Sequence, residues 1–240
     1  MLESGAPGEV RTPGLMIRSH SLYPTELRAR AWYCVLLLYG CQNKRRISIV
    51  FMATSPTETE VKIPVSHLTD ISAKLRSAGF RESHPRQFEA NTLYDTPENR
   101  LRQEGTLLRL RQFGDRGVIT WKGVGVPGPY KSRPELETTV GSVQILHQIL
   151  TSIGFQPSFR YEKYRTEFRA DGAAGVVTLD ETPIGMFLEL EGPGDWIDRT
   201  AKTLGFSSRD YVLESYGKLY VADCERRGIH PSNMVFQSGS

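Results

Sequence analysis

The chain has 240 residues, of which 24% are charged and 39% are hydrophobic, and its formal net charge is +3. Residues 1–51 account for +4 of that charge and the remaining residues for −1, so the remainder lacks the broad basic surface of a nucleic-acid-binding protein. The three cysteines, Cys34, Cys41 and Cys224, have no metal-like spacing and predict reduced thiols in a cytoplasmic protein.

The first 51 residues do not resemble part of a fold. They are rich in Pro, Gly and Arg, and their apolar run at residues 32–40 is far shorter than the ~20 residues that a membrane-spanning helix needs. No signal-peptide cleavage site of small residues follows that run. We expect Met52 to be the true start, with residues 1–51 a non-native extension; a disordered extension or a targeting arm is the alternative. The domain is then expected over residues 52–229, followed by a tail over residues 230–240.

From Met52 onward, hydrophobic periodicity and turn residues predict alternating strands and helices. In chain order we expect a strand at 57–64, a helix at 66–78, a strand at 86–94, a short turn capped by Thr96, hairpin strands at 106–113 and 117–123, a strand at 135–140, a helix at 142–153, strands at 159–170, 174–181 and 185–191, and helices at 195–204 and 208–222. The Gly- and Pro-rich loop at 123–134 is either a lid over a site or a long connection.

The predicted strands share an alternation of charged and aliphatic side chains. In the first strand Glu58, Glu60 and Lys62 share one face, because successive side chains of a strand point to opposite faces. The same pattern recurs at Arg109 and Arg111, at Arg133, Glu135 and Glu137, at Lys163 and Arg165, and at Glu189 and Glu191. Either these charged faces are solvated and unrelated, or helices cover the aliphatic faces and the charges line a shared interior.

A repeated strand–helix unit favours a shared interior. Three times, an acidic strand is followed by a helical segment that ends in Gly-Phe, and glycine suits the positive φ of a helix C-terminus. The three ends are Gly79-Phe80, Gly154-Phe155 and Gly205-Phe206. The apolar stripes of these helices, such as Leu146, Ile149, Leu150 and Ile153, would pack on the aliphatic sheet faces. The sequence therefore predicts an α+β fold built on a closed, polar-lined β-barrel.

Glutamate pairs that face one cavity repel each other, by an energy on the order of 4 kcal/mol at ~4 Å and an effective dielectric constant near 20. Protonation or a hard divalent cation relieves this repulsion. The metal candidates are Glu58, Glu60, Glu189 and Glu191, with Glu135, Glu137 and Asp180 as additional ligands. The phosphate-binding candidates are Arg109, Arg111, Lys122, Lys163, Arg165 and Lys218. The alternative is an internal lattice of salt bridges without a metal.

These motifs resemble the CYTH superfamily, which includes class IV adenylate cyclases, thiamine triphosphatases and inorganic triphosphatases. The resemblance begins with the ExExK signature at Glu58, Glu60 and Lys62 and extends over residues 57–221. Its further motifs are Tyr94-Asp95-Thr96-Pro97, Leu108-Arg109-Leu110-Arg111, Thr120-Trp121-Lys122, Arg133-x-Glu135-x-Glu137, Lys163-x-Arg165, Leu179-Asp180, Glu189-x-Glu191 and Ser215-Tyr216-x-Lys218. It implies a closed eight-stranded antiparallel β-barrel, the triphosphate tunnel, with helices packed outside.

This resemblance implies that the basic residues named above, together with Lys62 and Arg133, bind a triphosphate. It also implies that Lys62 and Lys163 are the catalytic residues and that the glutamates hold Mg²⁺ or Mn²⁺. Among the phosphate contacts, the loop residues Lys131 and Arg133 are the least secure. The stretch at residues 187–191 looks most like the class IV adenylate cyclase branch, which converts ATP to cyclic AMP and pyrophosphate. An inorganic or thiamine triphosphatase is the alternative, and a non-catalytic nucleotide or polyphosphate sensor is a third.

The expected partner is a small-molecule triphosphate, namely ATP, tripolyphosphate or thiamine triphosphate, rather than a nucleic acid or a membrane. The oligomeric state is left open, with a homodimer as one alternative. The motifs do not separate a cyclase from a triphosphatase, because both would use the same lining residues.

Overall fold

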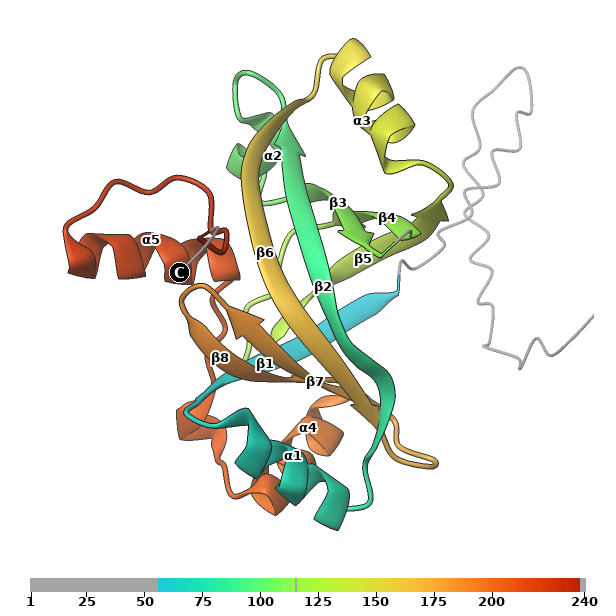
Figure 1. Ribbon diagram of the computed structural model, residues 1–240, viewed down its shortest axis with the longest axis vertical. Helices are drawn as coiled ribbons and strands as arrows, with labels where there is room; N and C mark the ends of the chain where they lie inside the picture. The colour runs from blue at the N-terminus through green and yellow to red at the C-terminus, as the bar shows by residue number, and fades with distance from the viewer. Residues whose placement is uncertain (1–55, 115, 238–240) are drawn as a thin grey trace, which may run out of the picture. The chain divides into compact units, whose positions relative to one another are not determined.

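The computed structural model describes residues 56–114 and 116–237. Its centre is a closed barrel of eight antiparallel strands in the order β1-β5-β4-β3-β2-β6-β7-β8 (Figure 1). The strands are β1 (Thr57–Val65), β2 (Arg81–Asp95), β3 (Leu107–Phe113), β4 (Arg116–Lys122), β5 (Lys131–Val140), β6 (Gln156–Arg169), β7 (Val176–Thr182) and β8 (Gly185–Glu191). The predicted α+β fold with a closed eight-stranded antiparallel barrel is confirmed. The expected extension and start at Met52 lie outside the described residues.

Helices cover the aliphatic faces of the strands, as the charge alternation predicted. The helices α1 (Leu68–Ser77) and α4 (Gly194–Leu204) pack together over the outer faces of β1, β7 and β8. This core contains Ile63, Leu75, Leu188 and Ile197, each no more than 1% exposed. Figure 1 shows α1 and α4 side by side at one end of the barrel and α3 (Val143–Ser152) at the other. Burying these aliphatic side chains leaves the charged faces to form the interior.

The Gly-Phe pairs end their helices in the same way at all three positions. Gly79, Gly154 and Gly205 have φ values of 86°, 99° and 89°, a region that favours glycine. The amide of the following phenylalanine donates to a carbonyl five residues earlier, at 3.0, 3.0 and 2.9 Å. These are the bonds of a Schellman-type helix end, so the repeat in the sequence marks a repeated C-terminal cap.

The predicted apolar stripe of α3 is only partly correct. Leu150 is buried and packs with Tyr94 and Leu110, whereas Ile149 and Ile153 are 50% and 65% exposed. A ten-residue helix that contacts β3 and β4 along one side can bury only a narrow part of its surface. Helical spacing alone therefore assigned too wide a face to the core.

Two strands begin earlier than predicted. Each predicted strand began just after a proline, whereas the structure accommodates that proline within the strand. β2 starts at Arg81, and Pro85 is accommodated by register shifts between Glu82 and Gln87 in its pairing with β6. β5 starts at Lys131, and the carbonyl of Pro134 accepts a bond from the Gly123 amide. Lys131 and Arg133 therefore lie on a strand rather than on the predicted loop.

The predicted helix at 208–222 is wrong in its bounds. Residues 208–210 form the 3₁₀ turn η1 (Ser208–Asp210). The helix α5 (Tyr216–Arg227) follows Ser215, whose side chain caps its N-terminus. Between them the backbone is extended, and Val212 exchanges two hydrogen bonds with Lys62 of β1. Tertiary pairing with β1 thus replaces the helical turns that periodicity favoured.

Residues 232–236 of the C-terminal tail pack on the barrel, although their sequence carries no pattern. The Met234 amide donates to the Arg160 carbonyl, and the Glu162 amide donates to the Met234 carbonyl. Met234 is fully buried with Tyr161 of β6 and Tyr220 of α5. The tail therefore pairs with β6 at residues 160–162, outside the segment 164–168 that pairs with β7.

The remaining helix, α2 (Arg100–Gln103), is a single turn after the Asp95 motif. The Asp95 carboxylate accepts the amides of Thr96, Leu101 and Arg102, and the predicted Thr96 cap is a longer 3.3 Å bond from the Arg100 amide. None of the helices in the described part of the chain is long and apolar enough to span a membrane.

Candidate active site

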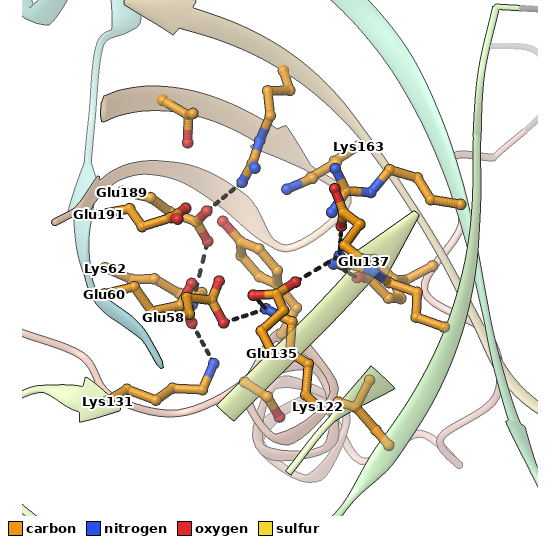
Figure 2. A pocket seen from close by; sticks show the side chains of 18 of the residues that line it. Glu58, Glu60, Lys62, Lys122, Lys131, Glu135, Glu137, Lys163, Glu189 and Glu191 are labelled. Atoms are coloured by element: carbon orange, nitrogen blue, oxygen red, sulfur yellow. Dashed lines mark hydrogen bonds and ion pairs between the residues drawn. The ribbon is translucent and has the colours of Figure 1, made fainter. Parts of the chain in front are cut away.

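The inward faces of all eight strands line one cavity of about 360 Å³ (Figure 2). It contains all but two of the predicted site residues. Those brought together are Glu58, Glu60, Lys62, Arg109, Arg111, Lys122, Arg133, Glu135, Glu137, Lys163, Arg165, Glu189 and Glu191. The period-two alternation of the sequence therefore placed these charges in a shared space, as predicted from the aliphatic faces.

Lys62 is the centre of the acidic wall formed by β1 and β8. Its ammonium donates to Glu60 at 2.8 Å and lies 3.2 Å from Glu189. Although burial works to lower it, the charges of these two glutamates raise the pKa of Lys62 well above its usual value. Lys62 therefore stays a fixed positive charge rather than acting as a base.

Two further lysines neutralise the carboxylates of β1. Lys131 of β5 pairs with Glu60, and Lys122 of β4 pairs with Glu58 while lying 3.1 Å from Glu135 (Figure 2). Burial alone would raise the pKa of Glu60, but Lys62 and Lys131 hold it well below its usual range. Part of the expected salt-bridge lattice is thus present in this structure.

Asp180 lies beneath the cavity rather than in its lining. It is fully buried and accepts bonds from Lys163 at 2.8 Å, from Arg165 at 2.7 and 2.6 Å, and from the Tyr216 hydroxyl at 2.8 Å. Burial and Asp180 together raise the pKa of Tyr216, so its hydroxyl stays protonated as a donor. Asp180 thus accepts four hydrogen bonds, three of them from cations, in a position outside the cavity lining; its assignment as a metal ligand stays a prediction.

The arginines retain donors that no protein group satisfies. Arg109 donates to Thr120 at 3.0 Å and more weakly to Glu137 at 3.4 Å, and Arg111 lies 3.7 Å from Glu89. Within the described residues, the buried Nε atoms of Arg109, Arg111 and Arg133 have no hydrogen-bond partner. Buried donors are normally satisfied, so this wall is suited to an anion that supplies acceptor oxygens.

The carboxylates at the other side of the cavity suit a divalent cation. Burial and the charges of Glu58 and Glu60 raise the pKa of Glu191, which is exposed at the cavity surface, to about 7. Across residues 56–114 and 116–237, no three acidic, His or Cys side chains lie close enough together to enclose a metal ion. Mg²⁺ commonly uses only one or two carboxylates plus substrate phosphate, so this all-oxygen, mutually repelling set fits such an ion.

Lys218 is exposed on α5 and lies outside the cavity lining, whereas its neighbours Ser215, Tyr216 and Gly217 contribute to it. The sequence motifs did not assign the lining residues Tyr161, Thr178 and Tyr216 to the site, and they named Lys131 only as an insecure contact on a loop. Lys131 was recoverable, because Lys131, Arg133, Glu135 and Glu137 form one unbroken alternation once a proline is allowed at position 134. Tyr161 and Thr178 carry no comparable signal, since uncharged residues alternate in the same way on any strand.

The lowered pKa of Lys131 predicts that anion binding weakens at high pH. Burial, Lys62 and Arg133 lower the pKa of Lys131 to about 8, so its charge is lost above that pH. Triphosphate binding should therefore weaken above pH 8, by up to about tenfold per pH unit for one linked proton. Calorimetric titration with tripolyphosphate between pH 6.5 and 9.5 tests this. Lys131→Arg, which keeps its charge over this range, should flatten the profile; an equally steep profile in that variant would refute the assignment.

A family model for the CYTH domain matches residues 56–216, more than half of the chain. A candidate adenylate cyclase of Methanocaldococcus jannaschii is 23% identical over 134 residues, covering 56% of this chain and 75% of that protein. The solved structure of a candidate adenylate cyclase from Vibrio parahaemolyticus has a TM-score of 0.61 at 20% identity, over 69% of this chain and 98% of the other. A Hippeastrum protein described as a candidate adenylyl cyclase with a dominant triphosphatase activity has a TM-score of 0.51 at 15% identity, over 72% and 97%. The chain therefore belongs to the CYTH domain family.

Proposed function

We propose that the protein is a divalent-metal-dependent enzyme acting on a triphosphate, foremost as a class IV adenylate cyclase that converts ATP to cyclic AMP and pyrophosphate. The observation that carries this proposal is the cavity itself. It combines three arginines with unsatisfied Nε donors and a set of repelling carboxylates in one interior. A polyanion would supply acceptor oxygens to the arginine side chains, and its bound cation would supply positive charge beside Glu191, whose pKa is raised by the neighbouring Glu58 and Glu60.

In this proposal, one or two of Glu58, Glu60 and Glu191 would hold Mg²⁺ or Mn²⁺ together with substrate phosphate, with Glu135, Glu137 and Glu189 as neighbouring carboxylates. The ion would neutralise charge on the phosphate chain and help align the attacking oxygen with the leaving group. Arg109, Arg111 and Arg133 bind the phosphate oxygens. Arginine suits this role because its planar fork binds two oxygens at once.

The lysines supply fixed positive charge where negative charge develops. Lys62 is held between Glu60 and Glu189, and Lys163 is held by Asp180 at 2.8 Å. Positions fixed before the substrate binds need no reorganisation during the reaction, which makes their electrostatic effect larger than in water. Lys62 and Lys163 are therefore proposed as catalytic groups that stabilise the transferring phosphoryl group and not as bases.

A triphosphatase is the second candidate, and the lining of the cavity favours it in one respect. Leu93, Leu107 and Phe159 are among the few apolar side chains in the lining, so most of it would contact phosphate rather than an organic group. In a cyclase, the ribose 3′-hydroxyl attacks the α-phosphorus and pyrophosphate leaves. In a triphosphatase, water attacks the terminal phosphorus and orthophosphate leaves. The same arginines and lysines serve both reactions.

Product analysis separates these functions. The protein would be incubated with ATP, tripolyphosphate or thiamine triphosphate, each with Mg²⁺, Mn²⁺ or EDTA, and the products separated by ion-exchange chromatography. Cyclic AMP with pyrophosphate supports the cyclase, and orthophosphate with a diphosphate supports the triphosphatase. Binding without any product would instead support the non-catalytic sensor. If the protein neither binds nor converts any of these triphosphates, the proposal is refuted.

A further inference from the structure

Strand β2 carries two buried polar side chains that face the barrel interior without lining its cavity. Glu89 is 6% exposed and Asn91 is fully buried, and they occupy alternate positions on the inward face. Glu89 is the register partner of Lys163 on β6, and Asn91 is the register partner of Arg111 on β3. Because Arg111 and Lys163 do line the cavity, Glu89 and Asn91 form a second layer beside these two cations.

Glu89 supplies charge to its neighbours without using their hydrogen bonds. One carboxylate oxygen lies 3.7 Å from an Arg111 terminal nitrogen, and the other lies 3.7 Å from the Lys163 ammonium. Both distances exceed the 2.7–3.2 Å of an N–H···O bond. Although burial works to raise it, the charges of Lys163 and Arg111 lower the pKa of Glu89 to about 2. Glu89 therefore stays ionised and leaves the N–H groups of both cations free.

Asp180 shows the opposite arrangement on the far side of Lys163. It accepts bonds of 2.6 to 2.8 Å from Lys163 and Arg165, so those N–H groups are already used. Lysine has three donors and arginine five, and a cation that binds phosphate must keep some of them unused. The loosely held Arg111 meets this requirement better than the tightly held Arg165.

Among the residues that the structure describes, three groups without hydrogen-bond partners lie on the inward faces of β2 and β3, beside Arg111 and Lys163. Within the described chain, the Arg111 Nε, both amide atoms of Asn91 and one Glu89 oxygen (Oε2) have no hydrogen-bond partner. The Arg111 Nε is a donor and the Asn91 Oδ1 on the register-paired residue is an acceptor, whereas the Glu89 Oε2 is an acceptor on the Lys163 side. A buried amide with no partner is unfavourable, and a ligand-bound arrangement that satisfies it would account for its presence here.

We propose that Glu89 and Asn91 are positioning residues for Arg111. When a triphosphate binds, the guanidinium turns so that Nε donates to Asn91 Oδ1 and both terminal nitrogens face phosphate oxygens. The charge of Glu89 attracts the guanidinium and keeps it close to β2 while it turns. This inference rests on the proposed binding of a triphosphate, and it adds two residues that touch no substrate.

Asn91→Leu tests the proposal, because leucine has nearly the same shape and no polar atom. The melting temperature should stay the same or rise, since two unsatisfied buried atoms are removed. The dissociation constant for tripolyphosphate, measured by calorimetry in EDTA, should rise about tenfold, and KM should change more than kcat. In an Arg111→Ala background, Asn91→Leu should have no further effect on binding.

Glu89→Gln provides a second variant that keeps the size of the side chain. It should also weaken tripolyphosphate binding in the wild-type background and have a smaller effect in the Arg111→Ala background. Glu82→Gln, an exposed change on the same strand, and Thr200→Val, a near-isosteric change at a buried position of α4, are the matched controls. Both controls should bind tripolyphosphate like the wild type.

Failure of the proposed function and failure of the positioning role alone give different results. If the wild-type protein binds no triphosphate, the proposed function and this inference both fail. If it binds, and the effects of Asn91→Leu and Arg111→Ala are simply additive, only the positioning role is refuted. Unchanged binding in both Asn91→Leu and Glu89→Gln would refute it as well.

Discussion

Glu58→Gln is expected to lower kcat by about two to three orders of magnitude while leaving the fold intact. The substitution keeps the side-chain size but removes one of the carboxylates proposed to hold the metal. Lys122, its ion-pair partner, also lies 3.1 Å from Glu135 and so is not left without a counter-charge. The measurement is turnover of the preferred triphosphate at increasing Mg²⁺ or Mn²⁺, together with the melting temperature of the same preparation.

The metal titration distinguishes ligand loss from a general loss of charge. A variant that has lost a ligand should require more metal to reach its residual maximum, and wild-type turnover should stop in EDTA. Glu225→Gln on α5, which is exposed and remote from the cavity lining, is the matched control and should behave like the wild type. Full activity of Glu58→Gln, or of the wild type in EDTA, would remove the metal site from the proposed function.

Asp180→Ala should produce the largest loss of stability. It leaves Lys163, Arg165 and the Tyr216 hydroxyl without the acceptor that now binds all three. Removing one partner of a buried ion pair costs about 3–5 kcal/mol of unfolding free energy. For a domain of this size that corresponds to a fall in melting temperature of about 10 °C. Thermal and urea unfolding followed by circular dichroism provide the measurement.

The same experiment separates the two roles considered for Asp180. If Asp180 orients cations, its replacement should lower the stability in EDTA as much as in Mg²⁺. If Asp180 is a metal ligand, its replacement should lower the stability mainly when metal is present. Asp171→Ala is the control, because Asp171 is fully exposed and forms only a 3.9 Å ion pair with Arg81. A small effect of Asp180→Ala in EDTA would favour the metal-ligand assignment over the orienting role.

Local patterns were sufficient for the barrel and most of its lining. The alternation at Glu58, Glu60 and Lys62 places three charges on one face of a strand whatever the fold, because side chains alternate along every strand. The Gly-Phe pairs likewise mark helix ends through the positive φ of glycine, which depends on a single residue. Features with a short sequence period, or fixed by one residue, were therefore readable in advance.

Long-range contacts decided what the sequence could not. Pro134 lies within β5 because β1 and the Gly123 amide pair with it, and the tail is ordered because β6 offers unpaired backbone groups to Met234. Whether a carboxylate faces the cavity or lies beneath it also depends on its partners. Glu189 lines the interior, whereas Asp180, one strand away, is covered by Lys163, Arg165 and Tyr216.

The sequence by itself determined which side chains share a face, where the three repeated helices end, and that the charges would meet in an interior. Only the tertiary structure decided which charges satisfy one another and which keep donors for a ligand. Alternation sets the direction of a side chain, but many of its hydrogen bonds depend on residues far away in the sequence, such as Glu58 for Lys122, which strand register brings close. For that reason the roles proposed for Glu89 and Asn91 became visible only in the folded barrel.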